Sequence, residues 1–168
     1  RLHAYCLRNF GLVRPESVLL GLNELNGKNE CYQYIPLLQT LKRYIKQEEV
    51  WNSMHRVTVK VPDVLYDFTD GDLCKQHSVF AEHDNALRLH VYVDDLELCN
   101  PLGSAKKKHS ITTVYFQIGN LDRRHLSSHR SIHLLCLAKA VYVKKYGPEK
   151  ILSRMISDVG VLESEGIN

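Results

Sequence analysis

The spacing of apolar residues changes about half-way along the chain. In the second half, three segments rich in β-branched and aromatic residues follow one another: 87-LRLHVYVDDLEL-98, 111-ITTVYFQIGN-120 and 131-SIHLLCLAKA-140. Their length and composition predict strands. Because the connections are short and contain turn residues such as Asn100, Pro101 and Gly103, we expect a three-stranded antiparallel meander.

Apolar residues at helical spacing predict two helices. The first begins after Pro36, with apolar positions at Leu37, Leu38, Leu41, Tyr44 and Ile45. The second begins at Pro148, after Gly147, with apolar positions at Ile151, Leu152, Met155, Ile156, Val159 and Leu162. An amphipathic helix of this kind is expected to pack on the sheet.

The first half of the chain has weaker patterns. Residues 1–30 show no periodicity and contain the turn-rich run 23-NELNGKNE-30, so we expect an irregular lead-in. Residues 58–72 are interrupted by Pro62 and by an Asp70-Gly71 turn, which predicts a loop or a short edge element. We therefore expect a helical or irregular extension at residues 1–85 and an α/β domain at residues 86–168.

Composition limits the class of protein. The 168 residues are 44% hydrophobic and 24% charged, which is typical of a folded chain with one ordinary core. No apolar run reaches the roughly 18 residues of a membrane span, so we expect no membrane partner. Five scattered cysteines suit reduced thiols in the cytosol or nucleus. Because the sequence begins at Arg1, we expect a fragment of a longer protein.

Two adjacent carboxylates, Asp94 and Asp95, stand inside the first predicted strand. Neighbouring residues of a strand point to opposite faces, so only one of the two can line a given site. Burying an unpaired charge is costly, so each carboxylate should meet solvent, a cation or a network of donors. The alternative to a functional site is a pair of exposed or hydrogen-bonded carboxylates near the end of a strand.

The local sequence resembles a known family. The stretches that carry the resemblance are 32-YQYIPLLQTLK-42, 67-DFTDGDLCKQHSVF-80, 92-YVDDLELCNPLGS-104, 107-KKHSITTVYFQIGNL-121, 127-SSHRSIHLLCLAKA-140 and 145-KYGPEKILSRMISDV-159. As a set they are similar to transposase-derived proteins of animal genomes, which in turn resemble the DDE transposases of CACTA elements. The resemblance covers most of residues 20–166.

The resemblance implies a partial ribonuclease-H-like fold, the first strands and helix of a nuclear, DNA-binding transposase core. It implies Asp94 as the catalytic residue and first ligand of Mg²⁺ or Mn²⁺, with Asp95 as a further candidate metal ligand. Two such ions activate the attacking group and stabilise the leaving oxygen of a phosphodiester. The other acidic residues are expected beyond residue 168, so this chain alone should be inactive. A second copy of the chain is a candidate partner beside DNA.

Two basic clusters are candidate phosphate contacts, one at a predicted hairpin tip and one after the next strand. Their members are Lys106, Lys107, Lys108, Arg123, Arg124 and Arg130. Phosphate contact predicts an affinity for nucleic acid that falls steeply with salt. The alternative for the lysines is a solvated turn that protects a sheet edge.

Other polar patterns are weaker. His125, His129 and His133 recur every four residues, but their segment is expected to be a loop entering a strand, where three imidazoles would not converge on zinc. We interpret 69-TDGD-72 as a turn, because the later ligands of a calcium loop are missing.

Two classes of function stay open. In the first, the chain is a fragment of a transposase-derived protein whose full-length form cleaves DNA and transfers strands with metal ions. In the second, it is a domesticated, non-catalytic module that binds nucleic acid or another protein. A large exposed apolar patch where further strands would pack would favour the protein-binding version.

Overall fold

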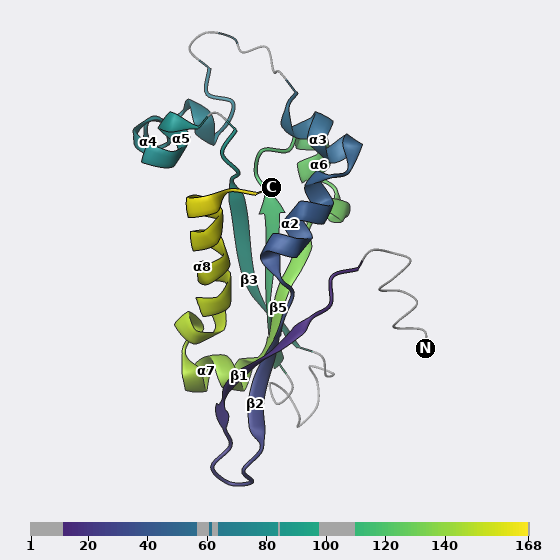
Figure 1. Cartoon of the computed structure of the whole chain (residues 1–168), viewed down its shortest axis with the longest axis vertical. Coiled ribbons are helices and arrows are strands. Elements are labelled where there is room, and N and C mark those ends of the chain that lie inside the picture. The colour runs from purple at the N-terminus through teal and green to yellow at the C-terminus, as the bar shows by residue number, and fades with distance from the viewer. Residues whose placement is uncertain (1–11, 57–60, 62–63, 84, 98–109, 168) are drawn as a thin grey trace.

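A five-stranded antiparallel sheet runs through the molecule in the order β1-β2-β5-β4-β3 (Figure 1). The structure is a computed structural model, and it describes residues 12–56, 61, 64–83, 85–97 and 110–167. The strands are β1 (Glu16–Leu22), β2 (Asn29–Tyr34), β3 (Leu89–Glu97), β4 (Ser110–Ile118) and β5 (His133–Lys139). The chain is therefore an α/β protein built on one sheet.

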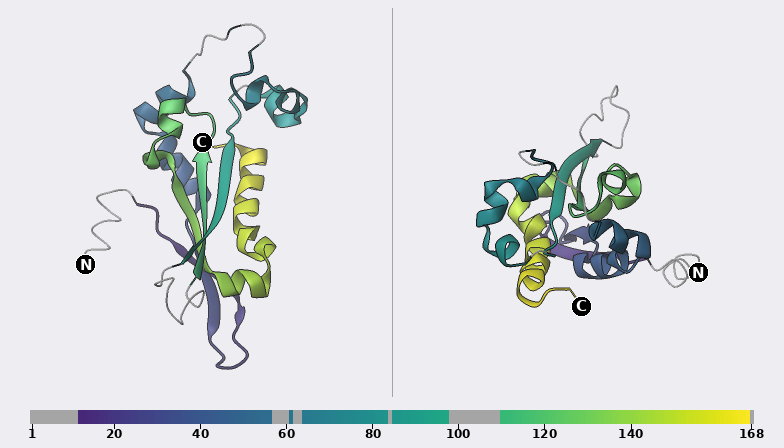
Figure 2. Two further views of the ribbon diagram at one scale, coloured as in Figure 1. Left: turned by 180° about the vertical axis from the view of Figure 1, so that it is seen from behind. Right: turned by 90° about the horizontal axis from the view of Figure 1, so that it is seen from above.

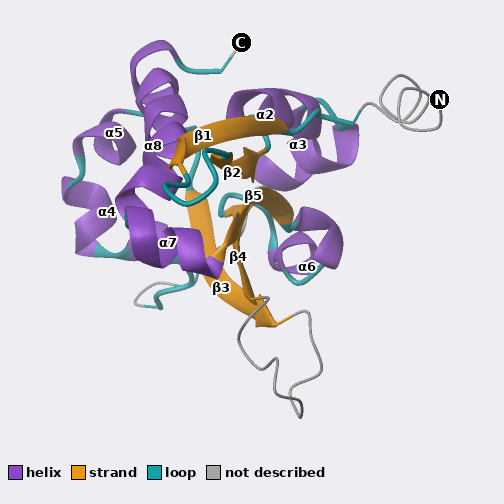
Figure 3. Ribbon diagram, turned by 90° about the horizontal axis from the view of Figure 1, so that it is seen from below, coloured by secondary structure: helices purple, strands orange, loops and turns teal. Residues whose placement is uncertain are grey.

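Helices surround this sheet. They are α2 (Leu37–Ile45), α3 (Glu48–Met54), α4 (Asp72–Gln76), α5 (Ser78–Glu82), α6 (Arg123–Leu126), α7 (Ala140–Tyr146) and α8 (Pro148–Glu165), with 3-10 turns η1 (Phe68–Asp70) and η2 (His129–Ser131). The view from below in Figure 3 shows α7 and α8 on one side of the sheet and α6 on the other.

The predicted elements of the second half are confirmed. The three predicted strands are β3, β4 and β5, and they form an antiparallel meander. The predicted helix at Pro148 is α8, and Gly147, with φ +84°, separates it from α7. Such a positive φ suits glycine at the end of a helix. The helix predicted after Pro36 is α2, which begins at Leu37.

Two expectations about the sheet were wrong. The sheet has five strands and not three, and the described part of residues 1–30 is not irregular, because it forms β1 and the start of β2. The turn-rich run is the loop of this hairpin: the Asn23 side chain accepts hydrogen bonds from the Leu25 and Asn26 backbone, and Gly27 adopts φ +65°. β2 pairs with β5, so strands from residues 1–85 and 86–168 share one sheet.

β4 has one mainly apolar face and an opposite face on which Thr113 and Gln117 alternate with Ile111 and Tyr115. Val114, Phe116 and Ile118 alternate along β4 and are fully buried in the hydrophobic core. Side chains in between point to the other side, so Thr113 and Gln117 lie on the opposite face. We call these the core face and the polar face.

Helices α7 and α8 cover the core face. Tyr34 of β2 is paired with Cys136 of β5, which is paired in turn with Val114, so all three share this face. The buried Tyr34 hydroxyl donates a 2.8 Å hydrogen bond to Asp158 of α8, itself 5% exposed. Burial and the neighbouring carboxylate raise the pKa of Tyr34, so the hydroxyl keeps its proton and remains a donor.

A second polar cluster joins β2 to α7. The carboxylate of Glu30 accepts hydrogen bonds from Lys145 Nζ at 2.8 Å, Tyr146 Oη at 2.7 Å and Asn23 Nδ2 at 2.8 Å. The bonds from Lys145 and Tyr146 lower the pKa of Glu30 to about 2. These contacts fix the hairpin β1–β2 to the last turn of α7.

The Tyr34–Asp158 bond predicts the result of removing one hydroxyl group. Tyr34→Phe leaves a buried carboxylate without its donor, so the free energy of unfolding should fall by about 1–3 kcal/mol. Urea denaturation measures the change. Tyr92→Phe is the matched control, because Tyr92 is 53% exposed, and it should change stability by less than about 0.5 kcal/mol. Equal losses in the two variants would contradict the role of the Tyr34 hydroxyl.

Candidate nucleic-acid interface

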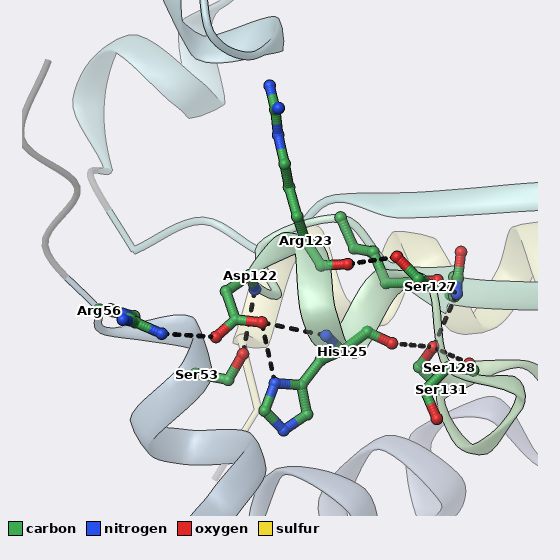
Figure 4. A network of polar contacts seen from close by, with 10 residues as sticks. Ser53, Arg56, Asp122, Arg123, His125, Ser127, Ser128 and Ser131 are labelled. Atoms are coloured by element: carbon green, nitrogen blue, oxygen red, sulfur yellow. Dashed lines mark hydrogen bonds and ion pairs between the residues drawn. The ribbon is translucent and has the colours of Figure 1, made fainter.

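A short basic segment, residues 122–131, joins β4 to β5 through α6 and η2. Asp122 caps α6: its carboxylate accepts a 3.0 Å hydrogen bond from the His125 backbone and lies 3.0 Å from His125 Nδ1. The other carboxylate oxygen lies 3.4 Å from Arg56 Nη1, and the Asp122 backbone donates to Ser53 Oγ at 3.0 Å. Figure 4 shows how these contacts attach the basic segment to the end of α3.

The charge of Asp122 is balanced inside this network. Hydrogen bonds from the backbone and ring of His125, together with the bond from Arg56, lower the pKa of Asp122 to about 2. The carboxylate therefore stays ionised at neutral pH, and its bonds go to His125 and Arg56. Neither Arg124 nor Arg130 of the basic segment bonds to this carboxylate in the described structure.

Gln117 anchors the basic segment over the polar face. Its Nε2 donates to the Leu126 carbonyl at 2.8 Å and to Ser131 Oγ at 2.7 Å. The Ser131 hydroxyl, 1% exposed, also lies within 2.8 Å of the His125 and Ser128 carbonyl oxygens. These bonds hold α6 and η2 in a single arrangement at the end of the sheet.

The three arginines of the basic segment have different surroundings. Arg123 Nη2 donates to the Tyr66 carbonyl at 3.3 Å, and its side chain points away from Asp122 (Figure 4). Arg124 and Arg130 are exposed, and within the described part of the chain no acidic side chain forms an ion pair with either. Arg123 therefore supports a neighbouring loop, whereas Arg124 and Arg130 can receive an external anion.

Arg124 and Arg130 line one cavity of about 380 Å³. Its other wall comes from the end of α2 and the start of α3, where Tyr44, Gln47 and Glu49 lie. The arginines give this cavity a positive rim, which Glu49 balances only in part. The two walls of the cavity are about 80 positions apart in sequence. The spacing of the basic residues along the chain therefore could not reveal the cavity.

Two rings form the inner part of this cavity. Tyr44 and His133 meet edge to face with ring centroids 4.2 Å apart, and His133 stacks on Phe116 at 5.2 Å. Burial lowers the pKa of His133, so its imidazole is neutral at pH 7. The cavity thus combines an aromatic interior with a cationic rim.

The sheet places Asp94 and Asp95 on opposite faces. Asp95 is paired with Thr112, which alternates with Val114, so it lies on the core face, where Thr112 Oγ1 donates to its carboxylate. Asp94 is paired with Thr113 and therefore lies on the polar face, exposed to solvent. The hydrogen bond from Thr112 gives the Asp95 carboxylate a partner within the sheet. Of the two acids, Asp94 is the one that shares a face with the basic segment.

Asp94 lacks partners for a metal site in the described structure. A site for Mg²⁺ or Mn²⁺ is built from carboxylate oxygens that converge. Among the described residues, no three His, Cys, Asp or Glu side chains are grouped so that they could hold an ion. Asp94 Oδ1 instead accepts a 2.8 Å bond from the Asp95 backbone. The described residues do not compose the metal centre that the resemblance implies, and we derive no chemical step through it.

The basic segment lies along the same face as Asp94. Thr113, opposite Asp94, and Gln117, beneath α6, are separated by four residues of one strand, or about 13 Å. Lys106, Lys107 and Lys108 lie outside the described residues. The strand ends that flank them, Glu97 and Ser110, are at the other end of β4 from α6. Of the two basic clusters, the structure therefore describes only the one that contains Arg123, Arg124 and Arg130.

Among the described residues, β3 forms an edge of the sheet and pairs with β4 alone. Four apolar or aromatic side chains of this strand are exposed, and Val93 is the most exposed at 59%. They are Val91, Tyr92, Val93 and Leu96. An edge of this kind can pair with a further strand.

The other sequence predictions have local explanations. The run 69-TDGD-72 is a turn, as predicted: Asp67 and Asp70 form a reciprocal cap at η1. Asp67 also pairs at 2.8 Å with Arg88, a buried arginine that sequence reasoning missed. Arg88 Nη2 donates to the Gly119 carbonyl at 2.8 Å as well, so this arginine joins the η1 loop to the end of β4.

Comparisons with known proteins identify no family. No protein-family model, no curated protein and no solved structure matches the chain. The resemblance to CACTA-type transposases therefore stays a prediction. Among the described residues, no helix has both the length and the apolar character needed to cross a bilayer.

The Asp122 network predicts a pH-dependent stability. A carboxyl whose pKa is lowered on folding stabilises the folded state above its ordinary pKa near 3.8, and this contribution disappears as the pH falls toward 2. Asp122→Asn keeps a capping side chain but loses the charge, so it should cost about 1 kcal/mol at pH 6. The difference from wild type should vanish near pH 2.

Urea denaturation between pH 2 and pH 6 measures this difference. Asp72→Asn is the control, because the Asp72 side chain is 89% exposed and its nearest cation, Lys75, is 3.9 Å away. That variant should be indistinguishable from wild type at every pH. An Asp122→Asn defect that is independent of pH would show that the charge of Asp122 is not what stabilises the segment.

Proposed function

We propose that this chain binds nucleic acid through its basic segment, residues 122–131, as a part of a transposase-derived, ribonuclease-H-like core that is inactive by itself. The observation that carries the proposal is the pair of exposed guanidinium groups, Arg124 and Arg130. They border one cavity on a segment that is fixed by its own hydrogen bonds. Nucleic acid in the nucleus is the partner that this surface suits.

The fixed backbone of the basic segment supports this assignment. Arginine forms paired, charge-assisted hydrogen bonds to phosphate oxygens, and these are stronger than bonds between neutral groups. The backbone that carries Arg124 and Arg130 is already fixed by bonds to Asp122 and Ser131, so only the two side chains have to be ordered when they bind. Arginine side chains on a fixed backbone are typical of contacts to the sugar-phosphate backbone of nucleic acids. Such contacts give affinity without sequence specificity.

A metal-dependent nuclease origin is supported by the position of Asp94. Its face is the one on which the basic segment lies, so a nucleic acid bound to Arg124 and Arg130 would approach it. In this extension of the proposal, Asp94 contributes one carboxylate and the remaining ligands come from outside the described residues. Asp95 is not assigned to this site, because it lies on the core face of the sheet, opposite to Asp94.

The edge of β3 favours a second candidate function, binding to another protein by strand addition. An extended segment can pair with an open sheet edge through its backbone, and apolar side chains on alternate positions add specificity. Val91 and Val93 would lie beside such a strand on one face, with Tyr92 on the other. This use of the edge is compatible with nucleic-acid binding at the basic segment.

The two arginines predict the salt dependence of binding. With a labelled duplex in fluorescence anisotropy, the double variant Arg124→Ala, Arg130→Ala should bind at least about ten-fold more weakly at low salt. The slope of log affinity against log salt should fall by about 2, since each lost phosphate contact removes about 0.9. The control removes two exposed lysines at the other end of the sheet, Lys28→Ala with Lys144→Ala, and should have a small effect. Equal weakening by both double variants would contradict a localised interface.

Asp94 predicts a separate effect of metal ions. If it is a metal ligand beside bound phosphate, Mn²⁺ should strengthen DNA binding by wild type, and Asp94→Asn should abolish this gain. In the absence of Mn²⁺, Asp94→Asn should bind DNA as well as wild type or better, because a negative charge is removed. Asp95→Asn, on the other face, is the matched control. An identical response of all three proteins to Mn²⁺ would reject the nuclease origin and leave the binding function intact.

A further inference from the structure

The cavity beside the basic segment has three chemically different parts. Its rim carries Arg124 and Arg130, its interior carries the rings of Tyr44 and His133, and polar side chains such as Gln47 lie between them. A simple phosphate-binding surface needs only the first part. The combination therefore indicates a ligand that has both an anionic group and a flat, partly polar ring system.

The rim suits a phosphate group. The guanidinium groups of Arg124 and Arg130 make no ion pair within the described ranges, and Ser128 lines the cavity between them in sequence. Ser128 Oγ accepts a weak 3.3 Å bond from the Arg130 backbone, and its own hydroxyl hydrogen can be donated to an anion. The one carboxylate in the wall, Glu49, belongs to α3, opposite the arginines.

The interior suits an aromatic base. Tyr44 and His133 are packed against each other and against Phe116, so their rings are held in place. His133 Nε2 is buried and has no hydrogen-bond partner among the described residues. Stacking on an aromatic side chain stabilises an unpaired base without regard to its identity, and nearby polar groups can bond to its edge.

The size of the cavity limits the ligand. A volume of 380 Å³ lies near the lower end of the roughly 300–1,000 Å³ range of small-molecule sites. It is large enough for a single nucleotide and too small for a base pair with its neighbours. A base can enter only if it is outside a stacked duplex.

We infer that this cavity binds one unpaired nucleotide, with its phosphate on Arg124 and Arg130 and its base against Tyr44 and His133. The inference rests on the proposed function and makes it more specific, because it names unpaired nucleic acid as the preferred form. A strand end, a single-stranded region or an extrahelical base would then bind better than a continuous duplex.

A mononucleotide titration tests the cavity directly. Trp51, the single tryptophan of the chain, follows the cavity residue Val50 in α3, so its fluorescence can report binding. Deoxyadenosine monophosphate should change this fluorescence in a saturable way. Deoxyadenosine and inorganic phosphate, which each supply half of the contacts, should bind at least about ten-fold more weakly.

Single variants test the contribution of the arginine rim and of the polar side chain Gln47. Arg124→Ala and Arg130→Ala should each reduce affinity for the mononucleotide by about ten-fold, and Gln47→Ala should reduce it less. Lys144→Ala on α7 is the charge control and should leave the affinity unchanged. Circular dichroism of each variant establishes that the fold is retained. Loss of binding in Lys144→Ala to the same extent would overturn the assignment.

A second measurement distinguishes this inference from the proposed function. A single-stranded oligonucleotide should bind at least about five-fold more tightly than a duplex of equal length, and Arg124→Ala with Arg130→Ala should remove the preference. Equal affinity for both forms, without mononucleotide binding, would reject the cavity and leave nucleic-acid binding standing. Mononucleotide binding without affinity for either polymer would reject the proposed function and leave the cavity as a nucleotide site. Failure of all three ligands would reject both.

Discussion

The alternation of side chains along β4 is the constraint on which the rest of the structure depends. Because successive residues of a strand point to opposite faces, Val114 and Phe116 enter the core while Thr113 and Gln117 point away from it. The core face then receives α7 and α8, with the Tyr34–Asp158 bond buried between sheet and helix. A shift of the register by one residue would exchange the two faces and lose both the core and the anchor of α6.

The hydrogen bonds that hold the basic segment in place involve Asp122, Gln117 and Ser131. They do not involve the side chains that could bind a ligand. The Asp122 carboxylate bonds to His125 and Arg56, and Ser131 is held by Gln117, so the backbone of α6 and η2 is fixed without using Arg124 or Arg130. This division of roles is what distinguishes the basic segment from an ordinary charged loop. Because these local bonds hold the segment, the Arg124 and Arg130 side chains remain exposed at the border of one cavity.

Nucleic-acid binding and a nuclease origin place different demands on the chain. Binding requires positioned cations and aromatic surface, and the described residues provide both around one cavity. Metal-dependent cleavage requires several converging carboxylates, and among the described residues no such group forms around Asp94. The open edge of β3 beside Asp94 is where additional structure could complete such a site or where another protein could pair. These physical differences make binding the better supported of the two functions.

The sequence by itself determined the local elements: β-branched runs produced β3, β4 and β5, and helical spacing with Pro148 after Gly147 produced α8. It also required Asp94 and Asp95 to face opposite ways, because that follows from strand geometry alone. It did not reveal β1 and β2, since two short strands with polar and glycine positions become stable only by pairing with each other and with β5. Only the tertiary structure decided which acid lies on the core face, and only it brought Tyr44 and Arg124 to one cavity. Both depend on contacts between residues far apart in the chain, and local patterns carry no information about such contacts.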